Sequence, residues 1–161
     1  MRLRPMPVVM VSTRTAEQSD AAVRALSLGA LECIDLKLLQ RGDPRVAKLS
    51  DTVVMAGHAN VRASQKQDAL PGVPSKTTGF EWNGRSVFIG SSTGGVDALM
   101  QVFAEYPENC PPTVVVQHMP APFLESFARR LNAHCNADVR LAKGGEVLQP
   151  GRVLLAAGGD H

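Results

Sequence analysis

One stretch constrains the fold of this chain more than any other: residues 86–95, in which a short apolar run breaks into a glycine-rich turn. Within that turn, Gly90 and Gly94 flank Ser92 in a G-x-S-x-G pattern. Glycines at these places let the backbone turn sharply from a strand into a helix and leave the central hydroxyl exposed at the strand's carboxyl end. The pattern predicts a strand-turn-helix unit with Ser92 as a candidate nucleophile. The alternative is a tight turn of small residues with no chemistry.

A second apolar run, residues 113–117, ends at His118, which follows Ser92 by 26 positions. In a parallel βαβ unit both residues lie at the same edge of the sheet, and neighbouring strands are about 4.8 Å apart. A serine hydroxyl is a weak nucleophile at neutral pH until an adjacent base takes its proton. The pair Ser92 and His118 is therefore the minimum that an acyl-transfer enzyme needs.

From Ser86 onward the chain alternates strand and helix patterns, which favours the α/β class with a doubly wound parallel sheet. Two further strands are expected at residues 139–142 and 153–156, as an added hairpin-like pair. His134, near the end of the second helix, is expected to interact with that helix's C-terminal carbonyls. Apolar stripes at helical spacing predict the core faces of the two helices: Val96, Leu99, Met100 and Phe103, then Leu124, Phe127, Ala128 and Leu131.

Five segments carry a resemblance in both order and spacing: GSSTGG at 90–95, VQHMP at 116–120, SFARRLN at 126–132, PG at 150–151 and GGDH at 158–161. Together they closely resemble the catalytic domain of the chemotaxis protein-glutamate methylesterase (CheB) family. The resemblance implies hydrolysis of glutamate methyl esters, and deamidation of some glutamines, on membrane chemoreceptors, without metal or organic cofactor.

The resemblance also implies roles for individual residues. Ser92 corresponds to the nucleophile and His118 to the general base, while backbone amides hold the oxyanion. The family's third triad member, an aspartate on a later loop, has no counterpart and is expected beyond His161. The substrate and oxyanion pocket would be shaped by residues around the pair: Ser91, Thr93, Gly94, Gly95 and Met119.

Residues 1–37 look like the last third of a flavodoxin-like response-regulator receiver domain, with Ser12 at the position that senses the phosphoryl group. A histidine kinase would be the partner of an intact receiver. The family's lysine is replaced here by Leu36, with Lys37 one place late, and the phosphoryl-accepting aspartate would lie upstream of Met1. Without the resemblance, Ser12 is simply a small residue at the end of a strand.

A linker is expected over residues 38–79, with a helix at about 44–56 followed by a stretch rich in Ser, Gln, Lys, Pro and Gly at 62–78. The first half of the methylesterase domain would then occupy residues 80–161. On this interpretation the chain is a fragment truncated at both ends.

Composition limits the other functions. A net charge of +2 from 17 basic and 15 acidic residues implies neither nucleic acid nor an anionic membrane as partner. Three scattered cysteines without a C-x-x-C pair, and no apolar run of transmembrane length, favour a cytoplasmic protein with no metal site. Two alternatives stay open: an inactive truncated interaction module, and a phosphate- or nucleotide-binding α/β domain, although G-x-G-x-x-G is not fulfilled.

Overall fold

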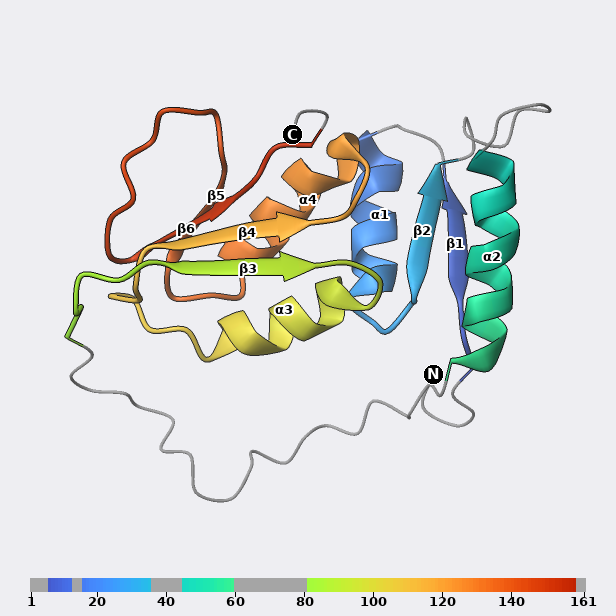
Figure 1. Ribbon diagram of the computed structural model, residues 1–161, viewed down its shortest axis with the longest axis horizontal. Coiled ribbons are helices and arrows are strands. Elements are labelled where there is room, and N and C mark those ends of the chain that lie inside the picture. Colours follow the sequence, from blue (N-terminus) through green and yellow to red (C-terminus); the bar gives the residue numbers. More distant parts are fainter. Residues whose placement is uncertain (1–5, 13–15, 36–44, 60–80, 159–161) are drawn as a thin grey trace, which may run out of the picture. The chain divides into compact units, whose positions relative to one another are not determined.

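The computed structural model describes residues 6–12, 16–35, 45–59 and 81–158 (Figure 1). The chain divides into two compact units, Met1–Pro74 and Ser75–His161, and each is described by itself. The predicted polar stretch at 62–78 lies outside the described residues.

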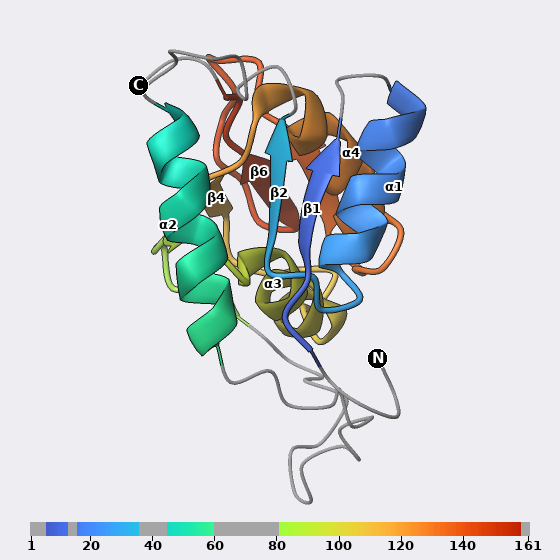
Figure 2. The same ribbon diagram turned by 90° about the vertical axis from the view of Figure 1, so that its right-hand side faces the viewer.

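The first unit contains a parallel strand pair and two helices: β1 (Val9–Ser12), α1 (Ala16–Leu26), β2 (Glu32–Asp35) and α2 (Arg45–His58). β1 pairs with β2 along its full length, and Figures 1 and 2 show the two strands side by side. α1 packs against both strands, which buries Ala22, Val23 and Leu26. α2 agrees with the predicted helix to within two residues at each end.

The second unit holds the turn around Ser92 within a four-stranded sheet of order β3-β4-β6-β5, in which all neighbours are parallel. The α/β class and the parallel sheet predicted from the sequence are confirmed. The elements, in chain order, are β3 (Val87–Ser91), α3 (Gly95–Ala104), β4 (Thr113–Gln117), α4 (Ala121–Asn132), β5 (Asp138–Leu141) and β6 (Arg152–Leu155).

The predicted hairpin-like pair of β5 and β6 is wrong, because these two strands run parallel and β6 lies between β4 and β5. A hairpin connection is typically two to five residues long, whereas residues 142–151 return the chain to the starting end of the sheet. Gly151, with φ of 79°, ends this connection, and a Cβ there would lie 2.8 Å from the Glu108 carbonyl oxygen. The apolar run of β6 is typical of a central parallel strand.

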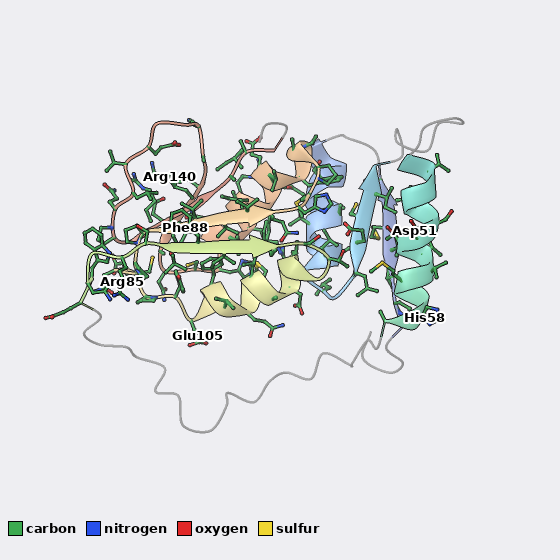
Figure 3. All side chains as sticks on the ribbon, in the orientation of Figure 1. Asp51, His58, Arg85, Phe88, Glu105 and Arg140 are labelled. Carbon is green, nitrogen blue, oxygen red and sulfur yellow. The ribbon has the colours of Figure 1, made fainter. Side chains whose placement is uncertain are left out.

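The two faces of the sheet differ in burial, although Leu154 on the more exposed face is also buried. Val115, Val153 and Leu155 lie on one face and are fully buried. α3 and α4 contact each other, so they lie on the same side of the sheet, and the predicted stripes face this core. On the opposite face, Phe88 and Val116 are 72% and 57% exposed, and Phe88 is labelled in Figure 3.

Candidate active site

The parallel pairing of β3 and β4 brings Ser92 and His118 together. The strands pair in register up to Ser91 and Gln117, and the ladder continues with a hydrogen bond of 2.8 Å from the His118 amide to the Ser91 carbonyl oxygen. The next side chains therefore leave the sheet side by side. The Ser92 Oγ lies 3.2 Å from the His118 Nδ1, within the range expected of a nucleophile and its base.

Both members of this pair are exposed at the carboxyl ends of their strands, where α/β folds usually bind ligands. The ring nitrogen that faces the hydroxyl is Nδ1.

Two glycines shape the turn after Ser92, each for a different reason. Gly94, the N-cap of α3, has φ of 76° and ψ of −5°, a left-handed conformation that favours glycine. Gly95 starts the helix, and its amide donates a hydrogen bond of 2.7 Å to the Ser92 carbonyl oxygen. A Cβ on Gly95 would lie 2.9 Å from Ser91 Oγ and would overlap Gln117 Oε1. The backbone at Ser92 is thus held against the first turn of α3.

Gln117, for which the sequence predicted no role, is the last residue of β4 and contacts the backbone of both members of the pair. Its side chain is buried, and its Oε1 accepts a hydrogen bond from the Ser91 hydroxyl. Its Nε2 donates to the carbonyl oxygens of Ser92, at 3.0 Å, and His118, at 3.3 Å. The available signal was a long polar side chain at the end of an otherwise apolar strand, because a buried amide needs partners close by.

The other predicted site residues differ in position and in exposure. Thr93 is exposed in the turn, and Met119 is half-buried directly after His118. Ser91 points inward to Gln117 rather than outward beside Ser92. Ser12 belongs to the other unit, where it ends β1 in register with Asp35.

Two further histidines lie near helix ends. His58, at the end of α2, is exposed and is labelled in Figure 3. His134 Nδ1 lies 2.8 Å from the Arg130 carbonyl oxygen in the last turn of α4, which confirms its predicted contact with that helix end.

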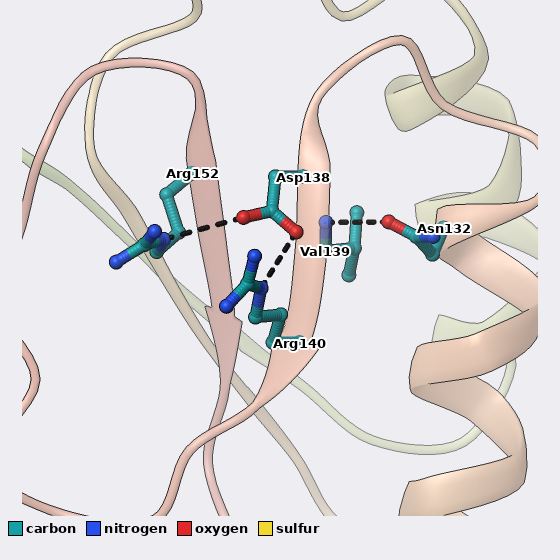
Figure 4. A network of polar contacts seen from close by, with 5 residues as sticks. All are labelled: Asn132, Asp138, Val139, Arg140 and Arg152. Atoms are coloured by element: carbon teal, nitrogen blue, oxygen red, sulfur yellow. Dashed lines mark hydrogen bonds and ion pairs between the residues drawn. The ribbon is translucent and has the colours of Figure 1, made fainter.

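A charged network lies at the starting ends of β5 and β6, opposite the edge that carries Ser92 (Figure 4). Arg140 Nε and Arg152 Nε lie 2.8 and 3.4 Å from the two carboxylate oxygens of Asp138. The hydrogen bond from Arg140 is the main cause that lowers the pKa of Asp138 below its ordinary value. Asp138 thus forms ion pairs with two arginines, at the opposite end of the sheet from His118.

Within the described ranges, no three histidine, cysteine or acidic side chains are grouped so that they could hold a metal ion. None of the helices in the described part of the chain is long and apolar enough to cross a membrane.

Comparison with known proteins finds a family model and named relatives that match this chain. The family model described as CheB methylesterase matches residues 87–161. A Caulobacter vibrioides protein named protein-glutamate methylesterase/protein-glutamine glutaminase 1 is 45% identical over 160 residues, which are 99% of this chain and 46% of that protein. An Agrobacterium fabrum protein of the same name, without the numeral, is 44% identical over 165 residues, which cover 100% of this chain and 46% of that protein.

Among solved structures, the CheB methylesterase catalytic domain of Thermotoga maritima is 45% identical, with a TM-score of 0.46 over 48% of this chain and 41% of that chain. The chain spans about half the length of the curated relatives it matches. Residues 87–161 are therefore similar to the CheB methylesterase family.

Proposed function

We propose that this chain carries the nucleophile and the base of a protein-glutamate methylesterase. Its substrates would be methyl esters of glutamate side chains, and some glutamine amides, on methyl-accepting chemotaxis receptors. The observation that carries the proposal is the Ser92 hydroxyl held 3.2 Å from the His118 Nδ1. The names of relatives at 44–45% identity support the same reaction class.

In this reaction, Ser92 Oγ attacks the ester carbonyl carbon while His118 takes the hydroxyl proton. The tetrahedral intermediate carries a negative charge on the former carbonyl oxygen, which backbone amides of the turn at residues 92–94 would stabilise at the N-terminal end of α3. Collapse of the intermediate expels methanol, which takes the proton from His118. Water then gives a proton to His118 and attacks the carbonyl carbon of the acyl-serine. The Ser92 oxygen leaves and takes that proton back, and the product is a free glutamate carboxylate.

The pocket residues have distinct parts in this proposal. Thr93 and Met119, which follow the two reacting residues in the chain, would line the place of the substrate side chain. Gly94 and Gly95 would keep the turn narrow enough for the ester carbonyl to approach the backbone. Ser91 faces the interior and would not touch the substrate.

The assay is methanol release from methylated chemoreceptor. Because the chain spans about half of its relatives, the test uses an extended chain: residues 1–161 joined at both ends to the parts of the Caulobacter relative outside the matched region. We expect methanol release that Ser92→Ala reduces by at least about 10³-fold, the scale seen when triad serines are removed. Ser91→Ala is the matched control and should change the rate by less than about tenfold. Equal methanol release by Ser92→Ala and the parent chain would contradict the proposal.

For the rest of the chain, we propose that residues 1–37 are the end of a receiver domain and residues 38–79 a linker to the methylesterase part at 80–161. The parallel β1-α1-β2 unit with Ser12 at the end of β1 supports this proposal. A histidine kinase would act on the intact receiver. A cytoplasmic location is supported by three free cysteines, Cys33, Cys110 and Cys135.

A further inference from the structure

We infer that Gln117 is a positioning residue: its buried amide ties the backbone at Ser92 to the backbone at His118 and so sets the distance between the two reacting side chains. The inference rests on the proposed function, because it concerns the same pair. It adds a residue that touches neither substrate nor the reacting atoms.

The contacts fix which way the amide of Gln117 points. Oε1 accepts from the Ser91 hydroxyl, and Nε2 faces two carbonyl oxygens, those of Ser92 and His118. The flipped amide would set Oε1 against two oxygens that cannot donate, so this orientation alone gives every group a partner. With Oε1 facing the Ser91 hydroxyl, the N–H groups of the amide are directed at the carbonyl oxygens of Ser92 and His118.

The two carbonyls that Gln117 binds belong to the two residues that carry the chemistry. One N–H group bonds the turn after β3, and the other bonds the chain after β4, so a single planar group bridges the two. Its side chain is only 7% exposed, and hydrogen bonds so shielded from water are costly to leave unmade. The bridge is therefore a rigid spacer between Ser92 and His118.

Gly95 provides the room for this spacer. A Cβ at this position would overlap Gln117 Oε1 and lie 2.9 Å from Ser91 Oγ. The backbone conformation of Gly95 is ordinary and helical, so backbone strain does not require glycine here. The space that the missing Cβ leaves is filled by the Gln117 amide and the Ser91 hydroxyl.

The kinetic consequence follows from geometry. A displacement of about 1 Å between reacting groups can cost about 10²-fold in rate, because attack needs a narrow range of distance and angle. Loss of the bridge should thus lower kcat and leave KM nearly unchanged, since Gln117 lies below the substrate site.

The kinetic test is Gln117→Met in the extended chain, because methionine fills a similar volume and makes none of the three hydrogen bonds. We expect kcat to fall by about 30- to 100-fold, with KM within about twofold of the parent value. The control is Thr113→Val on the same face of β4. Thr113 is also fully buried and bonded, to the Pro111 carbonyl oxygen at 2.8 Å and the Tyr106 hydroxyl at 3.1 Å.

Thr113→Val should lower the melting temperature but leave kcat within about twofold, because it loses buried bonds at the far end of the strand. A kcat of Gln117→Met within twofold of the parent, or an equal loss of kcat in Thr113→Val, would overturn the positioning role. Either result with an active parent chain leaves the proposed function intact.

A second measurement does not depend on activity and uses the 161-residue chain. Crystal structures of the parent, Gln117→Met and Gly95→Ala chains should show the Ser92–His118 contact in the parent and its loss, to beyond about 4 Å, in both variants. Persistence of the contact in Gln117→Met would refute the inference. Absence of hydrolysis from the parent, with the contact present, would count against the proposed function alone.

Discussion

At the scale of single residues, the site depends on positions that look interchangeable in the sequence. Gly94 and Gly95 are neighbours, yet they are glycine for different reasons. Gly94 has a left-handed backbone conformation, and at Gly95 there is no space for a Cβ atom. Ser91 and Ser92 are neighbours as well, yet one hydroxyl points into the protein toward Gln117 and the other lies beside His118. The alternation of side chains along a strand explains this, because consecutive residues point to opposite sides.

The charged network predicts a dependence of stability on pH. Arg140 and Arg152 hold the pKa of Asp138 below its ordinary value, so its stabilising effect is complete above the unfolded pKa of about 3.9. It is lost as the pH falls through the lower, folded-state pKa. Because the Asp138 side chain is 38% exposed, the solvent-screened contribution should be no more than about 1 kcal/mol.

The variant Asp138→Asn keeps the shape and removes the charge. The difference in free energy of unfolding between parent and variant should be largest near neutral pH and should shrink below about pH 4. Urea unfolding can follow it through Trp82, the single tryptophan, which lies in the same unit. High salt should reduce the difference. A difference of the same size at pH 3 and pH 7 would show that the charge has no part in it.

The residues that could be predicted are those whose pattern is local. G-x-S-x-G and a histidine at the end of the next strand led to Ser92 and His118, which the parallel register places within contact distance. Whether they act in catalysis stays a prediction. The position of Gln117 could not be found this way, because its three partners come from two different segments that only the folded sheet brings together.

At the scale of elements, periodicity predicted the helices and the individual strands but not their order in the sheet. The apolar stripe of α4 is buried as expected, and β5 and β6 lie within one residue of the predicted strands. Their pairing was missed because strand patterns do not specify a partner. The sequences of the two strands are consistent with the observed order. β6 has apolar residues at successive positions, as in a central strand, whereas polar and apolar residues alternate in β5, as in an edge strand.

The unequal faces of the sheet give a prediction for two phenylalanines. Phe127 on α4 is fully buried, so Phe127→Ala should lower the free energy of unfolding by about 3–5 kcal/mol. Phe88 on β3 is 72% exposed, so Phe88→Ala should change it by less than about 0.5 kcal/mol. Urea unfolding followed by Trp82 measures both. Comparable losses in the two variants would mean that the Phe88 face is covered in solution.

At the scale of the whole molecule, the chain combines two compact units and matches its curated relatives over about half of their length. The composition of the chain limits its partners but does not identify the reaction. The reaction class came from a few motif residues in the second unit, and the matched segment 87–161 coincides with that unit's sheet and helices. The proposed function therefore depends on the edge of a single sheet.

The most direct test of the central claim is a double-mutant cycle on Ser92 and His118 in the extended chain, with ester hydrolysis as the readout. Ser92→Ala and His118→Ala should each reduce kcat by at least about 10³-fold, and the double variant should be little worse than either, because a nucleophile and its base act as a unit. If the two losses multiplied, or if Ser91→Ala were the inactive variant, the assignment of the pair would be wrong.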